Sequence, residues 1–278
     1  MIFRNIYAKI IMFADDKTVI VTEPTLNDAV NKAIVVLEKF QSWCHKNQLI
    51  VNIEKTNLIH FKLKANTTNI QIDYKQFRLK NATVTKFLGI HIDETLKFTE
   101  QINIVCKKLN TLYYQFLKEY IRHDQMIMYY YTNVFSTMKY GILIWGRSSE
   151  IQRVFVTQKR IIRLIYNIPY RNTCKNCFIQ NEIFTIHALY TYELITYMHS
   201  KKLFNKIKVQ NKYDTRTNLA YDFSHRTGFY EKSPIYTGYK IYCKLPTKIM
   251  NEENDRQFNK QLKNYLIKEA PYDIKSLM

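Results

Sequence analysis

The chain has 278 residues, of which 42 are Lys or Arg and 23 are Asp or Glu, so its formal net charge is 42 − 23 = +19. Apolar residues make up 46% of the sequence, which excludes wholesale disorder. With only 5 Gly and 5 Pro, collagen-like and Gly- or Pro-rich chains are excluded as well. An excess of positive charge this large favours an anionic partner, either nucleic acid or an acidic membrane face.

The sequence predicts no membrane span and no signal peptide. No apolar run approaches the roughly 18–20 residues that cross a bilayer, and Lys9 interrupts the apolar N-terminal stretch. The 5 cysteines are odd in number and mostly scattered, which is more typical of a reduced protein than of a disulfide scaffold. We therefore expect an intracellular protein, nuclear or cytoplasmic, that is not secreted and does not enter a membrane.

The first predicted element is a β-hairpin. Apolar and β-branched residues fill Ile6–Ala14 and again Thr18–Val21, with Asp15 and Asp16 between them. Paired carboxylates in a turn held by two strands supply the hard oxygen ligands that Mg²⁺ prefers. Taken alone, however, the tetrapeptide Phe13-Ala14-Asp15-Asp16 is explained as well by an ordinary acidic turn, because Asp favours turns.

A helix and several short strands follow. Apolar residues recur every three or four positions between Thr25 and Asn47, which predicts a helix, and Thr25 with Asp28 resembles a capping box. Polar residues 66–69 predict a turn. The other apolar segments before residue 95 predict short strands over 49–53 and 58–63, and further strands in small hairpins over 70–72, 77–79 and 87–92.

Beyond about residue 95 the apolar spacing becomes that of helices. Helices are predicted over 99–117 (with Thr99 as its cap), 124–139, 150–166, 183–204 and 255–268. Residues 206–250 are basic, rich in Tyr and only weakly periodic. We therefore expect an α+β part over residues 1–95, a helical region over 96–205 and a basic C-terminal region over 206–278.

Several motifs occur in an order that resembles the reverse transcriptases of non-LTR (LINE-type) retrotransposons, most closely the jockey-like branch. Phe13-Ala14-Asp15-Asp16 is similar to the family's catalytic turn, and Asn52 to Thr56 resembles its Asn-x-x-Lys-Thr segment. Lys86 to Ile90 looks like the primer-grip hairpin. Residues 140–146, 158–163 and 234–246 are similar to the thumb and the C-terminal tail, so the resemblance runs from the aromatic-Ala-Asp-Asp motif onward.

The resemblance implies a fold and an activity. The fold would be a partial reverse-transcriptase palm, made of antiparallel hairpins and one helix, followed by a mainly helical thumb and C-terminal region. The parent activity would be RNA-directed DNA polymerisation, in which a primer 3′-hydroxyl attacks a deoxynucleoside triphosphate. The implied cofactor is Mg²⁺ or Mn²⁺, and the implied partners are an RNA template and a DNA primer.

The resemblance also assigns roles at the catalytic turn. Asp15 would be the essential catalytic metal ligand, and Asp16 would be its acidic neighbour with a lesser ligand role. Phe13 would pack near the incoming nucleotide or the primer end. Lys55 would lie near the triphosphate and donate a proton to the leaving pyrophosphate, which a phosphate-bound lysine is able to do. A solvated lysine after a strand explains Lys55 equally well.

Primer and template would be held further along the chain. The implied primer-grip residues are Phe87, Leu88 and Gly89, where Gly89 permits a close approach of the backbone. Four cations of the helix predicted over 150–166 would contact phosphates: Arg153, Lys159, Arg160 and Arg163. A plain strand with a bulge and a solvated helix face are the alternative explanations of these two groups.

One part of the family's pattern is missing. A polymerase palm needs another aspartate from an earlier strand, and none of the 14 residues before Asp15 is acidic. Two carboxylates of one turn do not easily hold two metal ions. We therefore expect the chain to be inactive alone and to need the missing N-terminal part of the polymerase. A non-catalytic nucleic-acid-binding remnant and an unfolded relic are the alternatives, and the sequence carries no homo-oligomer signal.

A zinc site is not expected. Cys174 and Cys177 have the Cys-x-x-Cys spacing of zinc ligands, and His187 and His199 lie downstream. The two histidines are 199 − 187 = 12 positions apart, whereas paired His ligands are typically 3–5 apart. They also fall within a strongly apolar predicted helix, where a histidine is more often packed or solvated.

Overall fold

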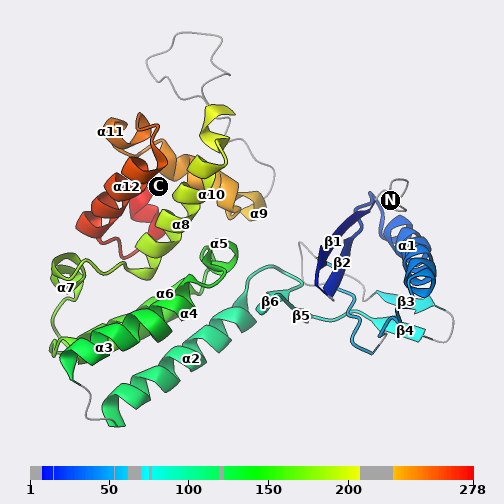
Figure 1. Ribbon diagram of the computed structural model, residues 1–278, viewed down its shortest axis with the longest axis horizontal. Helices are drawn as coiled ribbons and strands as arrows, with labels where there is room; N and C mark the ends of the chain where they lie inside the picture. Colours follow the sequence, from blue (N-terminus) through cyan, green and yellow to red (C-terminus); the bar gives the residue numbers. More distant parts are fainter. Residues whose placement is uncertain are drawn as a thin grey trace. The chain divides into compact units, whose positions relative to one another are not determined.

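The computed structural model describes residues 8–14, 16–52, 54–61, 70–74, 77–118, 122–206 and 228–278. The chain divides into two compact units (Figure 1). Unit 1 comprises residues 1–87 and 93–96, and unit 2 comprises residues 88–92 and 97–278. Figure 1 draws unit 1 in blue and cyan and unit 2 from teal to red.

Unit 1 begins with the predicted hairpin, which the structure confirms. Strand β1 (Lys9–Phe13) pairs antiparallel with β2 (Asp16–Ile20), and Phe13 faces Asp16 in the register. Asp16 therefore belongs to a strand and not to the turn. Ala14 has a φ of +49°, the left-handed conformation that two-residue hairpin turns require.

The predicted helix is also confirmed, as α1 (Leu26–Lys46). The Thr25 side chain caps it by accepting a hydrogen bond from the Asp28 amide at 3.2 Å. Its apolar face packs on the antiparallel pair β3 (Gln71–Tyr74) and β4 (Phe77–Lys80), around the buried Ile72 and Leu79. The partly buried side chains of this small core are Val30, Ala33, Ile34, Leu37, Leu58 and Ile70.

Two of the predicted strands are wrong over the residues that the structure describes. Residues 49–52 form no strand, and Ile50 is 98% exposed. Leu58 makes only an isolated bridge to Asn81. β-branched composition is insufficient here because, in the part of the chain that the structure describes, no strand pairs with these residues. Residue 53, residues 62–63 and the turn predicted over 66–69 lie outside the described residues.

Lys86 to Ile90, which resemble a primer-grip hairpin, do lie in a hairpin, but the strand expected over 87–92 is divided between its two strands. Strand β5 (Val84–Phe87) ends where that strand should begin, and β6 (Ile90–Asp93) follows after two residues. These two residues are Leu88, with φ +46°, and Gly89, with φ +81°. Because consecutive left-handed residues turn the chain back on itself, the apolar run is a hairpin tip and not one strand.

Unit 2 is helical and confirms the predicted helices. Thr99 is the first residue of α2 and not its cap, and the predicted helix over 124–139 contains a π-helix, η1. Short helices α5, α7, α9, α10 and α11 were not predicted. The bounds are α2 Thr99–Lys118, α3 His123–Tyr129, η1 Tyr130–Phe135, α4 Ser136–Lys139, α5 Ile142–Trp145, α6 Ile151–Ile165, α7 Lys175–Gln180, α8 Ile186–Ser200, η2 Leu203–Lys206, α9 Gly228–Glu231, α10 Pro234–Tyr242, α11 Thr247–Met250, α12 Asp255–Glu269 and η3 Ile274–Leu277.

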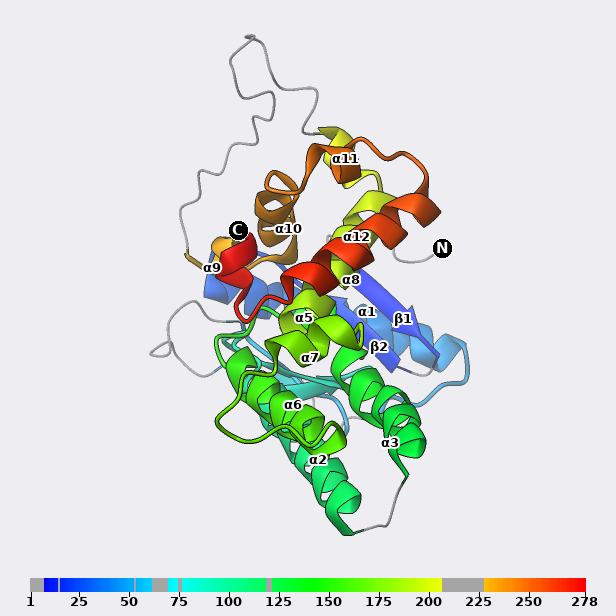
Figure 2. The same ribbon diagram turned by 90° about the vertical axis from the view of Figure 1, so that its left-hand side faces the viewer.

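Helix α8 is the centre of unit 2, with α10 and α12 packed against it and α6 alongside α2 (Figures 1 and 2). Its first six residues are all buried, which explains why it is apolar on every side. The buried Gln158 amide donates to the Tyr130 hydroxyl (2.9 Å) and to the Phe184 carbonyl (2.8 Å), and accepts from the Ile186 amide (2.9 Å). Among the described residues, no helix has the length and apolar character that crossing a membrane requires.

Candidate nucleic-acid interface

The outward face of α6 carries the four predicted phosphate-binding cations. The buried residues of α6 occupy one arc of the helix, and they are Ile151, Val154, Phe155, Thr157, Gln158, Ile161, Ile162 and Ile165. At 100° per residue, Arg153, Lys159, Arg160 and Arg163 all fall on the opposite arc. The apolar periodicity that buries one side of α6 therefore brings these four side chains to the other side.

Three of these cations lie beside aromatic rings. The Arg160 guanidinium carbon lies 4.6 Å from the ring centroid of Tyr113, and that of Arg163 lies 5.6 Å from the ring centroid of Tyr170. The Lys159 ammonium lies 4.7 Å from the Phe155 ring centroid. Such pairs are attractive and leave the charge of the cation in place. Of the three cations, Arg160 is exposed, whereas Lys159 and Arg163 are half-buried.

Arg153 differs because it is paired with an acid. Its Nη1 donates to a Glu150 carboxylate oxygen at 2.5 Å. Hydrogen bonds from the Thr99 hydroxyl and from Arg153 lower the pKa of the Glu150 carboxyl below its ordinary value. Glu150 therefore stays ionised and offsets part of the Arg153 charge.

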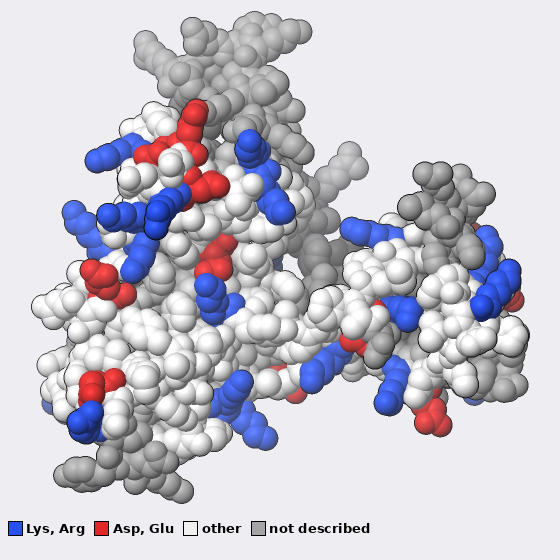
Figure 3. All heavy atoms as spheres, viewed as in Figure 1, with Lys and Arg blue, Asp and Glu red and all other residues white. Residues whose placement is uncertain are grey.

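The segment that follows Glu150 has one sign of charge. Residues 151–180 contain no Asp or Glu, and their basic residues are Arg153, Lys159, Arg160, Arg163, Arg171 and Lys175. Elsewhere, on the face that Figure 3 shows, Lys and Arg side chains are spread over both units with acidic side chains among them. Within residues 151–180 an anion would therefore meet cations and no carboxylate of the segment itself.

The acidic hairpin lies in unit 1 and presents its end to solvent. Phe13 is 60% exposed, and Asp16, its partner in the ladder, is exposed as well. Asp15 lies outside the described residues. The exposed Asp16 carboxylate offers the hard oxygen donors that Mg²⁺ takes. Within the described residues, no group of three or more His, Cys, Asp or Glu side chains is arranged to hold a metal ion.

Lys55 lies in a turn built by Asn52. Its amide donates to the Asn52 side-chain oxygen at 3.1 Å, and the Thr56 hydroxyl donates to the Asn52 carbonyl at 2.8 Å. This side-chain turn explains why asparagine and threonine flank the lysine at these spacings. The Lys55 side chain is exposed, and among the described residues it forms no ion pair with Asp16.

The predicted primer-grip residues lie at the tip of the β5–β6 hairpin. This tip is held in place by Tyr140, which the sequence did not indicate. Phe87 is half-buried at the end of β5, and Leu88 and Gly89 make the turn. The Tyr140 hydroxyl donates to the Leu88 carbonyl, and a Cβ at Gly89 would lie 3.3 Å from that hydroxyl. In the sequence, the one signal for this contact is that Tyr140 directly precedes a glycine. In the structure that glycine, Gly141, has a φ of +63°.

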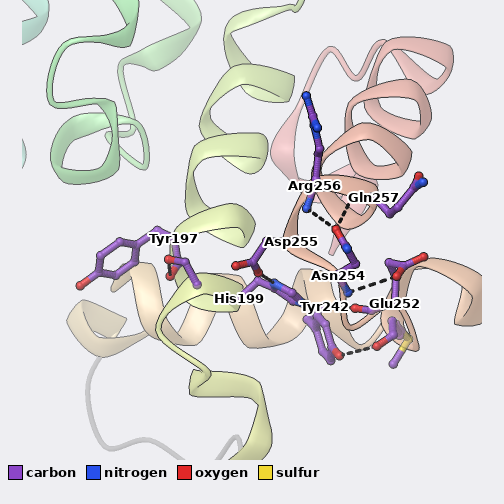
Figure 4. Close-up of polar contacts among 10 residues, drawn as sticks. Tyr197, His199, Tyr242, Glu252, Asn254, Asp255, Arg256 and Gln257 are labelled. Atoms are coloured by element: carbon purple, nitrogen blue, oxygen red, sulfur yellow. Dashed lines mark hydrogen bonds and ion pairs between the residues drawn. The ribbon is translucent and has the colours of Figure 1, made fainter.

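The Cys and His residues weighed as zinc ligands have other partners. Cys174 and Cys177 are buried at α7, and burial raises the pKa of both thiols. His187 bonds to Gln152 at 3.3 Å. His199 bonds to Asp255 at 2.8 Å (Figure 4). Its ring also stacks on that of Phe258, with a centroid separation of 3.8 Å. Both imidazoles therefore tie helices of unit 2 together.

Comparison with known proteins gives two curated relatives in Drosophila melanogaster. The chain is 24% identical over 180 residues to the probable RNA-directed DNA polymerase from transposon X-element, covering 61% of this chain and 20% of that protein. It is 27% identical over 166 residues to the probable RNA-directed DNA polymerase from transposon BS, covering 57% and 18%. The chain thus matches about a fifth of the length of these relatives. No family model matches the chain, and no solved structure matches it.

Proposed function

We propose that the chain is a portion of the reverse transcriptase of a non-LTR retrotransposon. The observation that carries the proposal is its similarity to two transposon RNA-directed DNA polymerases over about 60% of the chain. Unit 1 would supply part of the palm, with the acidic hairpin, and unit 2 would supply the thumb and the region after it. The ligands would be an RNA template and a DNA primer.

In this proposal the acidic hairpin serves nucleotidyl transfer. Asp15 and Asp16 would hold Mg²⁺ or Mn²⁺, which when bound activates the primer 3′-hydroxyl and stabilises the leaving pyrophosphate. The exposed ring of Phe13 would pack against the nucleotide or the primer end. Lys55 would protonate the leaving pyrophosphate.

The hairpin tip and α6 would hold the nucleic acid. Phe87, Leu88 and Gly89 would contact the primer backbone, and the exposed Gly89 in the turn would permit a close approach. The outward cations of α6 would bind phosphates of the template–primer duplex. Leu88, Gly89 and the α6 cations belong to unit 2, and Phe87 is the last residue of unit 1 before them.

Catalysis should require at least one carboxylate beyond Asp15 and Asp16. Two adjacent acids of one hairpin are too few ligands for the pair of metal ions that the reaction uses. A primer-extension assay with the purified chain and Mg²⁺ should therefore give no nucleotide incorporation. Incorporation that the Asp15→Asn variant abolishes would overturn this requirement while supporting the polymerase assignment.

Binding to an RNA template annealed to a DNA primer tests the proposal directly. Fluorescence anisotropy across a salt series should give an affinity that falls steeply with salt, because each phosphate contact releases counterions. Replacing Arg153 and Arg160 by Gln should weaken binding and reduce the log–log salt slope by up to about 2, roughly 1 per lost contact. Replacing the exposed Arg256 and Lys260 of α12 is the matched control. Absence of binding at low salt would contradict the proposal.

The alternative is a nucleic-acid-binding remnant without chemistry. The observation that favours it is that the cationic α6 face and the acidic hairpin belong to two different compact units. Under this alternative, template–primer binding would be indifferent to Asp15→Asn. A longer polypeptide that supplies the preceding strands would also show no primer extension.

A further inference from the structure

The second feature of the α6 face is aromatic. Tyr170 is 85% exposed, which is unusual for a ring of this size, and it lies between α6 and α7. The Asn172 amide donates to the Pro169 carbonyl at 3.0 Å, so Tyr170 and Arg171 are the central residues of a tight turn. Arg163 donates to the Asn172 carbonyl at 3.2 Å and fixes that turn to the helix.

A second ring lies beside the next cation of the same face. Tyr113 of α2 is half-buried under the Arg160 guanidinium. It contacts the 56% exposed Tyr114 edge-on, at a centroid separation of 5.6 Å. Arg160 and Arg163 are one turn apart on α6, so the two arginine–tyrosine pairs are neighbours.

We propose that Tyr113, Arg160, Arg163 and Tyr170 form a site for single-stranded nucleic acid, with unpaired bases stacking on the tyrosine rings. This rests on the proposed function and specifies the form of nucleic acid that the face takes. The arginines bind phosphates, and the rings take the flat faces of bases, which every nucleotide offers.

The chemistry favours a single strand over the other anionic partners. In a duplex the base faces are already stacked on each other, so an exposed tyrosine gains nothing from them. An acidic peptide would pair with the arginines, but its carboxylates would make no contact that explains the exposed Tyr170 ring. The absence of Asp and Glu over residues 151–180 suits a polyanion that runs along the segment.

The test separates ring stacking from charge. Labelled 20-mers of uridine and of thymidine, a duplex of equal length and a 20-mer with abasic sites are the probes. Tyr170→Leu should weaken binding of both single strands by roughly five- to tenfold, and Tyr170→Phe should bind as the unaltered chain does. Binding of the duplex and of the abasic strand should not change, nor should the salt slope, since no charge is removed.

Tyr197→Leu, at a 47% exposed position on α8, is the matched control and should have no effect. Equal binding of uridine and thymidine strands would identify bases and phosphates as the ligand, whereas a preference for uridine would add the 2′-hydroxyl to it. An unchanged affinity of Tyr170→Leu for single strands, or an equal loss on the duplex, would overturn the inference. Template–primer binding would survive that outcome, whereas failure of the proposed function would remove binding of every probe.

Discussion

The Tyr140 hydroxyl donates a hydrogen bond to the Leu88 carbonyl, 52 positions earlier in the chain, with an O···O distance of 2.5 Å. Tyr140 follows α4, and Leu88 is at the tip of the β5–β6 hairpin. The Leu88 carbonyl lies in the hairpin turn, where it has no partner across the strand ladder, and the Tyr140 hydroxyl supplies a donor for it. The hairpin tip is therefore held by a side chain of the helical unit.

Removing this hydroxyl tests how much the contact stabilises the tip. Tyr140→Phe should lower the free energy of unfolding of unit 2 by about 0.5–1 kcal/mol, a modest value because Tyr140 is 56% exposed and water can replace it. Urea titration followed by circular dichroism gives the value. Tyr197→Phe, whose hydroxyl makes no hydrogen bond within the described residues, should leave the midpoint where it is. An equal shift in both variants would refute the contact's role.

The glycine after Tyr140 is needed for two separate reasons. Gly141 has a φ of +63°, and a Cβ there would lie 2.3 Å from Cδ1 of the buried Ile90. Gly141→Ala should destabilise unit 2 by about 1–3 kcal/mol, through backbone strain and the clash. Differential scanning calorimetry should show a lower Tm. Gly228→Ala, where a Cβ meets nothing within 4 Å, should leave the Tm unchanged or raise it.

The buried amide of Gln158 should be the most costly polar side chain to remove. Gln158→Leu leaves the Tyr130 hydroxyl, the Phe184 carbonyl and the Ile186 amide without their partner in a dry interior. We expect a loss of about 3 kcal/mol or more in chemical denaturation. Gln180→Leu, at the exposed end of α7, should cost less than about 0.5 kcal/mol. Similar losses in the two variants would show that the network contributes little.

Stability should fall in acid because of His187. Burial lowers the pKa of its imidazole from 6.5 to about 4, so the unfolded chain binds the proton more tightly. The unfolded state therefore holds more protons between pH 6.5 and about pH 4. The free energy of unfolding is therefore at its full value above pH 6.5. As the pH falls toward 4 it decreases by up to about 3 kcal/mol, because folding keeps His187 neutral.

Denaturant midpoints measured from pH 4 to pH 7.5 check this sign. His187→Gln should flatten the dependence over that range, since it keeps a polar group beside Gln152 but does not titrate. His45→Gln, an exposed residue in the last turn of α1, should keep the slope of the unaltered chain. A slope that persists in His187→Gln would assign the acid sensitivity to other groups.

Much of the fold could be predicted because helix signals are local. Thr25, Asp28 and Asn47 mark both ends of α1 within the sequence itself, and the structure has them in those roles. Strands failed where pairing decides the outcome: residues 49–52 have strand composition, but no strand among the described residues pairs with them. The apolar run at 87–92 was expected in a hairpin, but it is not one strand, because two left-handed residues turn the chain within it.

In the candidate site, too, the local features could be predicted and the long-range contacts could not. The four cations of α6 could be assigned to one face from helical periodicity alone. Tyr113, Tyr140 and Tyr170 could not be assigned, because each acts through a partner far along the chain or through a turn. In a chain with 22 Tyr, composition gives no means of choosing these three.

The number of residues between α3 and α4 is critical because the π-helix η1 joins them. Its wider turn carries an extra residue between α3 and α4 and rotates the following side chains by about 100°. As a result α3 packs on α6 while α4 faces α2 and α8, where Met138 is fully buried. Deleting one residue from 130–135 would restore regular helix but turn Met138 away from its pocket. Related sequences should therefore admit gaps in the loops of unit 2 and none within this helix.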